Sequence, residues 1–141
     1  MPTVDEFNTR ARPFLPGHLG IVITKAEPGE TRTEMPVQVV HMAPNGFMHA
    51  GSVVTLADTT AGHGCMMNLP PGASFTTIEL KCNHLGTARD GTVDCVATPV
   101  HLGRTTQVWD AVVTHRESGR TLALFRCTQM VLLPREGMGT P

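Results

Sequence analysis

The segment from His49 to Asn68 constrains the fold of this chain more than any other part of the sequence. It contains no proline, lysine, arginine or glutamate, and its apolar residues recur at spacings of three and four, at Val53, Val54, Ala57, Ala61, Cys65 and Met66. Those spacings predict a helix, which Pro70 and Pro71 terminate. A helix with so few charged side chains cannot present a face to water, so we expect other elements nearly to surround it.

Most of the remaining chain is predicted to form strands. Runs of β-branched or alternating residues predict strands at 19–26, 31–40, 74–83, 92–102, 105–115 and 121–133. Pro99 lies inside the fourth of these runs, which predicts an edge position or a bulge there. Residues 1–18 contain three prolines and are interpreted as an arm or short helix laid over the domain, and residues 134–141 as a frayed tail.

One long buried helix and a series of hairpin-connected strands define an α+β domain. A chain of 141 residues has room for one such domain, which we place at residues 19–133. The expected arrangement is an antiparallel sheet curved around the central helix, since a flat sheet would cover only one side of it. A curved sheet of this kind leaves edges that are free to pair between subunits.

The composition excludes several classes of partner. Charged residues make up 16% of the chain and the formal net charge is -1, without the basic excess that nucleic-acid binding requires. No apolar run reaches the roughly 18 residues that span a bilayer, and the N-terminus lacks the pattern of a secretory signal. We therefore expect a cytoplasmic protein without nucleic-acid or membrane partners. The low charge indicates that another subunit covers part of the surface.

The cysteines and histidines give no sign of a disulfide framework or a metal site. Cys65, Cys82, Cys95 and Cys127 are scattered without a C-x-x-C pair and are interpreted as small core residues. The histidines show no recognised metal-ligand spacing. The chain has one tryptophan and no tyrosine, which argues against a cofactor held between aromatic rings. We expect neither a metal nor a cofactor.

Asp58 is the foremost candidate for a catalytic residue. It lies on the predicted helix in line with Val54 and Ala61. No lysine or arginine occurs between residues 33 and 78, so no nearby residue in the sequence can neutralise it. Burial without a partner disfavours the ionised carboxylate and raises its pKa, which suits a desolvated base or nucleophile. A partly exposed aspartate, or one that caps a neighbouring element, is the structural alternative.

A second candidate group lies at the N-terminal end of the same helix, in the segment from Asn45 to Gly51. The unpaired N–H groups of a first helical turn, here around Ala50 and Gly51, can bind a developing oxyanion with help from the helix dipole. His49 can orient a carbonyl group or a water molecule, and its alternative role is that of a helix-capping or core histidine.

The spacing of these two groups predicts an oligomer. Ala50 and Asp58 are eight residues apart, which is about 12 Å along one helix. They cannot reach the same carbonyl group from one chain. If both act, one of them comes from a symmetry mate, and the site lies across a two-fold interface.

Three motifs resemble those of a known family. The stretch His49-Ala50-Gly51-Ser52-Val53-Val54-Thr55-Leu56-Ala57-Asp58 resembles the H-G-G-x4-L-A-[DE] signature of hotdog-fold acyl-CoA thioesterases. Thr77-Ile78-Glu79-Leu80 matches the strand after the helix, and His101-Leu102-Gly103-Arg104 matches an H-x-G-R motif at a strand end. The resemblance covers roughly residues 19–132 and is to the phenylacetate-pathway (PaaI-like) and 4-hydroxybenzoyl-CoA thioesterase branches. It implies the hotdog fold, in which a curved antiparallel sheet wraps one long helix.

The resemblance implies a catalytic role for four residues and a substrate-binding role for Gly51. Asp58 is the carboxylate base or nucleophile, and an aspartate rather than a glutamate points to the phenylacetate-pathway branch. The Ala50 N–H polarises the thioester carbonyl, in a turn shaped by His49 and Gly51. Thr77 matches a hydroxyl that positions the attacking water. The implied reaction hydrolyses small acyl- or aroyl-CoA thioesters to free acid and CoA in a homodimer or homotetramer.

The resemblance also implies where the substrate is held. His101, Gly103 and Arg104 match the region that holds the coenzyme A arm, and the forked donors of arginine suit a phosphate. Asn45 lies near the position where relatives carry an amide, but out of register with it, and is a further candidate for substrate binding.

Two other functions stay open at the level of sequence. Ala50 replaces the usual glycine of the signature, and Ala43 stands where relatives often carry asparagine or glutamine. These differences leave room for a non-catalytic hotdog protein that binds acyl-CoA or serves as an assembly module. Asp58 and His63 have the spacing of a hydratase-type motif, although the Leu-Ala-Asp context favours a thioesterase.

Overall fold

The structure is a computed structural model and describes residues 2–135. Within this range, no helix is long and apolar enough to cross a membrane. The elements follow the chain in the order α1 (Val4–Ala11), α2 (Leu15–His18), β1 (Val22–Glu27), β2 (Glu30–Pro36), the 3₁₀ turn η1 (Val39–His41), α3 (Ala50–Met66), β3 (Ser74–His84), β4 (Thr92–Leu102), β5 (Thr106–His115) and β6 (Thr121–Leu132).

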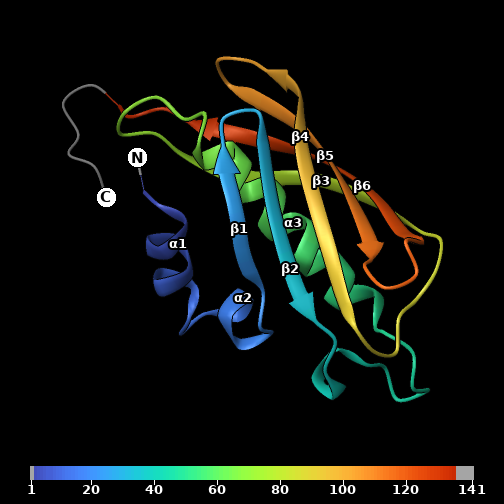
Figure 1. The fold of residues 1–141 in the computed structure, drawn as a ribbon. Helices are drawn as coiled ribbons and strands as arrows, with labels where there is room; N and C mark the ends of the chain where they lie inside the picture. Colours follow the sequence, from blue (N-terminus) through green and yellow to red (C-terminus); the bar gives the residue numbers. More distant parts are fainter. Residues whose placement is uncertain (1, 136–141) are drawn as a thin grey trace.

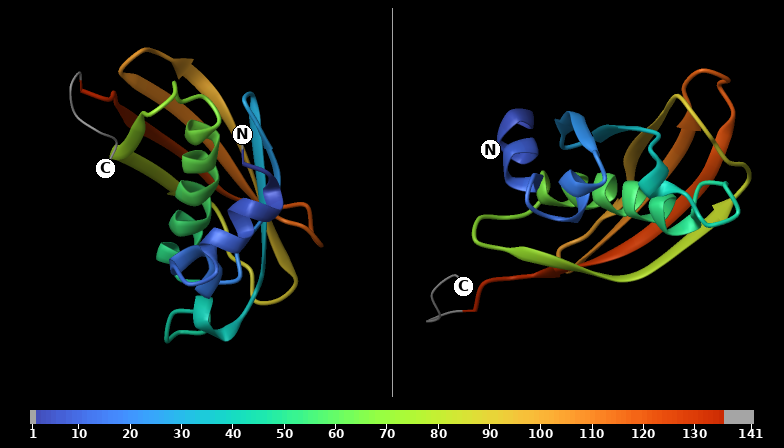
Figure 2. Two further views of the ribbon diagram at one scale, coloured as in Figure 1. Left: turned by 90° about the vertical axis from the view of Figure 1, so that its left-hand side faces the viewer. Right: turned by 90° about the horizontal axis from the view of Figure 1, so that it is seen from below.

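The six strands form one antiparallel sheet in the order β1-β2-β4-β5-β6-β3. The sheet curves around α3, which lies against its concave face (Figures 1 and 2). α1 packs against β1, which is an edge strand of the sheet. The predicted α+β fold, with a curved antiparallel sheet around one long helix, is confirmed.

α3 is nearly enclosed, as its composition predicts. Leu56 is fully buried, and within the helix only Ala50 and Gly51 of the first turn are exposed. Small residues allow the helix to approach the sheet closely. A Cβ atom added at Gly64 would lie 2.6 Å from the ring of Trp109. Any side chain at this position would push the helix away from the sheet.

The second strand is shorter than predicted. β2 ends at Pro36, and the chain then turns through η1 instead of continuing as a strand to Val40. The buried ring of His41 fixes this turn: its Nδ1 accepts a hydrogen bond from the Gln38 N–H (3.0 Å), so Nε2 carries the proton and donates to the Leu19 carbonyl (2.7 Å). Such a contact leaves no periodic signal in the sequence.

Pro99 lies at a bulge and not at an edge. β4 is an inner strand between β2 and β5, so the edge prediction is wrong. The pairing of β4 with β5 shifts register between Pro99 and His101, which confirms the bulge. A bulge interrupts the ladder and so tolerates a residue that has no N–H to donate.

The N-terminal residues are more regular than their prolines suggest. Thr3 and Glu6 form a capping box at the start of α1, and Phe7 packs edge-on against His63 of α3, with 4.8 Å between ring centroids. A short helix therefore covers the domain here. Of the tail expected at residues 134–141, residues 136–141 lie outside the described part of the chain.

The four cysteines are free thiols, and they fill the interior as predicted. Cys65, Cys95 and Cys127 are buried and Cys82 is partly buried. Burial raises the pKa of the Cys65, Cys95 and Cys127 thiols to about 12, so they stay neutral at physiological pH.

β3 forms a free edge of the sheet. Among the described residues it pairs only with β6, so one side of this 11-residue strand presents unpaired N–H and C=O groups. Ile78 and Leu80 on β3 are 52% and 42% exposed. A long apolar edge of this kind is a template for pairing with another chain.

Candidate active site

Asp58 lies on a side of α3 that the described residues leave partly open. Val54, Thr55 and Thr59 share this half-exposed side. Burial raises the pKa of Asp58. No cationic group in residues 2–135 forms an ion pair with this carboxylate. A half-buried carboxylate with a raised pKa and no countercharge is suited to accept a proton.

Thr77 brings a hydroxyl group from β3 to this carboxylate. Its Oγ1 lies 3.4 Å from Asp58 Oδ1 and 2.8 Å from Gln129 Oε1 on β6. Gln129 is fully buried, and its Nε2 donates to Cys127 Sγ at 3.4 Å. The structure therefore brings together Asp58 and Thr77, and it adds Gln129, which was not singled out from the sequence.

The first turn of α3 holds the second predicted group. His49 is the helix-capping residue, and its Nδ1 accepts a hydrogen bond from the Gly51 N–H at 2.7 Å. No residue in the described range accepts a hydrogen bond from the Ala50 N–H, and Ala50 is exposed. The Ala50 N–H is thus the open amide at the positive end of the helix dipole, where an oxyanion can bind.

Hydrogen bonds hold the loop before α3 in place at both of its ends. The His41 carbonyl accepts hydrogen bonds from the His49 N–H (2.8 Å) and from the Ser52 hydroxyl (2.9 Å). The Met48 N–H donates to Thr87 Oγ1 at 3.1 Å, beyond the end of β3. These contacts hold the first turn of α3 at the end of the sheet where β3 finishes.

Asn45 contributes to the shape of this loop. Its Oδ1 accepts a hydrogen bond from the Phe47 N–H at 3.1 Å, which closes a turn on the surface. The Arg89 guanidinium lies over the Phe47 ring, 4.2 Å from its centroid. The side-chain oxygen of Asn45 is therefore engaged within its own loop.

The turn between β4 and β5 carries the predicted coenzyme A residues. The Gly103 N–H donates to the Thr106 carbonyl at 2.9 Å, and a Cβ atom at Gly103 would lie 2.7 Å from His101 Nε2. Only glycine fits this tight turn. His101 and Arg104 are exposed on it.

This turn and Thr77 lie at the same end of the sheet. The strand registers pair Leu102 with Gln107, Gln107 with Gln129, and Gln129 with Thr77. The residues from Asn45 to Gly51 lie towards the other end, where β3 finishes. One chain therefore holds Asp58, Thr77 and the Arg104 turn in one region and the Ala50 amide in another.

A periodic signal could have revealed Gln129. The inward positions of the last strand carry Phe125, Cys127 and Val131, and Gln129 shares their alternation. A polar residue at an inward position needs a partner. The buried His41 offers no such signal, because its position follows from a loop.

His63 lies away from Asp58 and packs on Phe7 of α1. Its Nδ1 donates to the Thr59 carbonyl at 2.8 Å, and burial lowers its pKa. The hydratase-type spacing seen in the sequence thus corresponds to a histidine engaged in packing.

Comparison with known proteins identifies the family. Residues 45–123 match the Thioesterase superfamily. A 1,4-dihydroxy-2-naphthoyl-CoA hydrolase of Listeria monocytogenes is 31% identical over 118 residues, which are 84% of this chain and 95% of the relative. The proofreading thioesterase EntH of Klebsiella pneumoniae is 32% identical over 130 residues, 92% of this chain and 94% of the relative. The crystal structure of a thioesterase from Haemophilus influenzae superimposes with a TM-score of 0.90 at 29% identity, covering 98% of this chain and 96% of the other.

The fold and these similarities define a thioester hydrolase of the hotdog type. The chain belongs to the Thioesterase superfamily.

Proposed function

We propose that this protein hydrolyses small acyl- or aroyl-CoA thioesters to free acid and CoA. The observation that carries the proposal is Asp58, a half-buried carboxylate beside the Thr77 hydroxyl on the open side of α3. No cationic group among the described residues pairs with it. The Listeria relative is named for an aroyl-CoA substrate, which supports an aromatic acyl group. An aspartate at this position favours the phenylacetate-pathway (PaaI-like) type.

The complete site belongs to a homodimer. Ala50 and Asp58 are about 12 Å apart along α3, so one thioester carbonyl cannot contact both groups of one chain. Antiparallel pairing of two β3 edges would continue the sheet and set the two α3 helices side by side. Asp58 of one chain then faces the Ala50 amide of its mate. The outer face of the sheet, which exposes Val112 and Leu124, suits assembly of two dimers into a homotetramer.

Asp58 acts as the general base in this dimer. It takes a proton from water, and the water oxygen forms a bond to the thioester carbonyl carbon. The charge that develops on the carbonyl oxygen is stabilised by the Ala50 N–H of the other chain. The carbon–sulfur bond then breaks, and the proton on Asp58 passes to the departing thiolate, which leaves a carboxylic acid, a thiol and the ionised Asp58.

The remaining candidate residues hold and orient the substrate. Arg104 is exposed on a tight turn with His101 and Gly103, and its forked donors suit a phosphate of the coenzyme A arm. His49, Gly51 and Asn45 shape the loop that presents the Ala50 amide. The free thiols support a cytoplasmic location, where cysteines stay reduced.

Thiol release from a panel of aliphatic and aromatic acyl-CoAs tests this function, with light scattering on the same samples. We expect release of thiol from at least one aroyl- or arylacetyl-CoA by a dimer or tetramer. Bound acyl-CoA without thiol release would identify a non-catalytic binding protein instead. Full activity in a dilute monomer would overturn the shared site.

A further inference from the structure

A fully buried amide lies directly behind the candidate active site. Gln129 belongs to the inward-facing row of β6 and is 0% exposed. A buried amide needs hydrogen-bond partners, because an unpaired polar group in a core destabilises the folded state. The partners that Gln129 has therefore show what it does in the fold.

The two partners of Gln129 fix the orientation of its amide. Nε2 lies 3.4 Å from Cys127 Sγ, and Oε1 lies 2.8 Å from Thr77 Oγ1. An amide oxygen can only accept a hydrogen bond, so the Thr77 hydroxyl is the donor in the shorter contact. The single proton of the Thr77 hydroxyl is thus directed into the core, away from Asp58.

The contact between Thr77 and Asp58 has the length expected when that proton points elsewhere. Thr77 Oγ1 lies 3.4 Å from Asp58 Oδ1, whereas a hydroxyl that donates to a carboxylate lies at about 2.5–2.7 Å. Two oxygen atoms that face each other without a proton between them repel, and a water molecule that donates to both relieves this repulsion.

We propose that Gln129 is a positioning residue, whose buried amide oxygen holds the Thr77 proton so that Thr77 and Asp58 both accept hydrogen bonds from one attacking water. Such a water donates one proton to Asp58 and the other to Thr77. Both of its protons are then directed to the protein, and a lone pair is left to face the thioester carbonyl carbon. Gln129 touches neither substrate nor water and acts only through Thr77.

Gln107 provides a matched control for this inference. It pairs directly with Gln129 across β5 and β6, is 2% exposed, and uses its amide oxygen to accept from Trp109 Nε1 at 2.8 Å. Gln129 and Gln107 thus share residue type, burial and strand position. They differ in the group that each amide binds.

Gln129→Met and Gln107→Met test the inference, which rests on the proposed function. Methionine keeps the length of the side chain and removes the amide. We expect Gln129→Met to lower kcat about tenfold with little change in KM.

The Gln129→Met variant should also change the pH profile. Without the amide, the Thr77 hydroxyl is free to donate its proton to the Asp58 carboxylate, so the acid limb of the kcat profile moves to lower pH. Cys127 is the titratable side chain that the structure places in electrostatic contact with Asp58, and its thiol stays neutral over this range. Gln107→Met should lower the melting temperature and leave kcat and its pH profile unchanged.

Combination with Thr77→Val separates positioning from stability. Because Gln129 acts through Thr77, Gln129→Met added to Thr77→Val should lower kcat no further. Two independent losses that multiply, or equal kinetic effects of the two glutamine variants, would overturn the proposal. If Gln129→Met does not fold, Gln129→Glu replaces it. A carboxyl at this fully buried position stays neutral, so its carbonyl oxygen still accepts the Thr77 proton and its O–H donates to Cys127 in place of the amide. The kcat of Gln129→Glu and its acid limb should therefore stay near those of wild type, and a tenfold loss of kcat in this folded variant would overturn the proposal.

The same data distinguish this inference from the proposed function. A wild-type enzyme that hydrolyses thioesters and depends on Asp58, but is indifferent to Gln129, contradicts only the positioning role. A wild-type protein that releases no thiol from any acyl-CoA contradicts the proposed function itself.

Discussion

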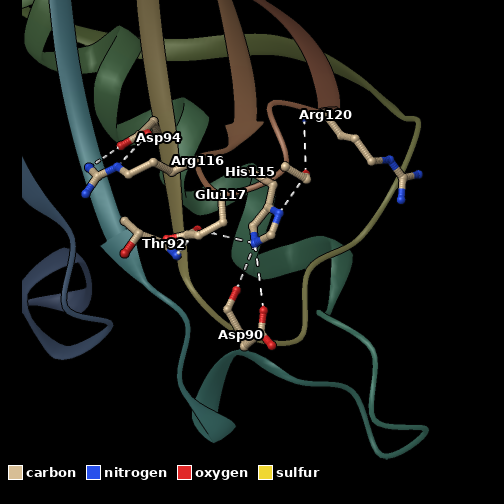
Figure 3. Close-up of polar contacts among 8 residues, drawn as sticks. Asp90, Thr92, Asp94, His115, Arg116, Glu117 and Arg120 are labelled. Carbon is tan, nitrogen blue, oxygen red and sulfur yellow. Dashed lines mark hydrogen bonds and ion pairs between the residues drawn. The ribbon is translucent and has the colours of Figure 1, made fainter.

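Two polar clusters of this molecule use similar residues and have opposite properties. The first surrounds His115 at the surface, where β5 and the start of β4 meet (Figure 3). Arg116 donates to both carboxylate oxygens of Asp94, at 2.6 and 2.9 Å, and Glu117 Oε1 accepts from the Thr92 N–H at 2.9 Å. The second cluster surrounds Asp58, whose carboxylate forms no ion pair with a cationic group of residues 2–135.

The difference shows how partners decide what a carboxylate can do. The Thr92 N–H lowers the pKa of Glu117, so this group is held ionised and has little tendency to take a proton. Burial raises the pKa of Asp58. The amides differ in the same way, because the Thr92 N–H donates to Glu117, whereas no residue of the described part of the chain accepts from the Ala50 N–H. The hydrogen bonds of the first cluster hold a loop against a hairpin, and the groups without partners in the second are the ones that the proposed reaction uses.

The largest expected effect is at Asp58. Asp58→Asn keeps the shape of the side chain and removes the basic oxygen, so kcat should fall roughly 10²- to 10⁴-fold, with little change in KM. The melting temperature should hold or rise, because a neutral amide is easier to bury than an unpaired carboxylate. Arg116→Ala in the surface cluster is the control, with normal kcat and slightly lower stability. Near-normal turnover of Asp58→Asn would end the proposed mechanism.

The open amide can be removed with one substitution. Proline is favoured at the first position of a helix, and His49 before it has the extended backbone that a residue before proline requires (φ -65°, ψ 134°). Ala50→Pro should therefore keep the fold and lower kcat about 10²- to 10³-fold, as loss of one oxyanion donor does. Circular dichroism checks the fold and steady-state kinetics the rate. If a folded Ala50→Pro variant turned over normally, the amide would have no catalytic role.

Arg104 tests binding at a distance from the chemistry. Arg104→Ala should raise KM about tenfold and change kcat less, because a phosphate contact contributes equally to ground and transition states. A pantetheine thioester that lacks the nucleotide should bind wild type and variant alike. A substitution effect of the same size on that truncated substrate would show that Arg104 has another role.

The smallest expected effect concerns stability and pH. The folded-state pKa of Asp58 is raised above its usual 3.8, so its ionisation lowers stability as pH rises through the raised pKa. The pKa of Glu117 is lowered from 4.5, so its contribution is present above 4.5 and is lost as pH falls through the lowered pKa. Urea unfolding at several pH values should show that the free energy of unfolding of Asp58→Asn increases relative to wild type as pH rises. That of Glu117→Gln should decrease relative to wild type over the same change. If the free energy of unfolding of both variants changed with pH in the same way as that of wild type, this contrast would be contradicted.

Local periodicity was sufficient to predict most of the fold. The helix at residues 50–66 and the alternating strands follow from side-chain spacing within each element. The uncharged composition of the helix predicted that it lies inside the sheet, and it identified Asp58 as the exceptional residue. The motif resemblance added Thr77, which does lie beside Asp58.

Local periodicity cannot predict contacts between residues that are far apart in the sequence. Thr77 and Gln129 are 52 positions apart, and their hydrogen bond depends on the order of strands in the sheet. The capping box of Thr3 and Glu6 is a weaker sequence signal than the three prolines of residues 1–18, which predict an irregular segment. The early end of β2 depends on His41, whose partners lie in other segments.

The free edge of β3 has a consequence for genetics. In the proposed dimer each site takes Asp58 from one chain and the Ala50 amide from the other. A chain with Asp58→Asn and a chain with Ala50→Pro are each inactive alone, but a mixed dimer of the two contains one site with both groups intact. Two defective alleles expressed in the same cell would therefore complement each other, while two alleles that both alter Asp58 would not.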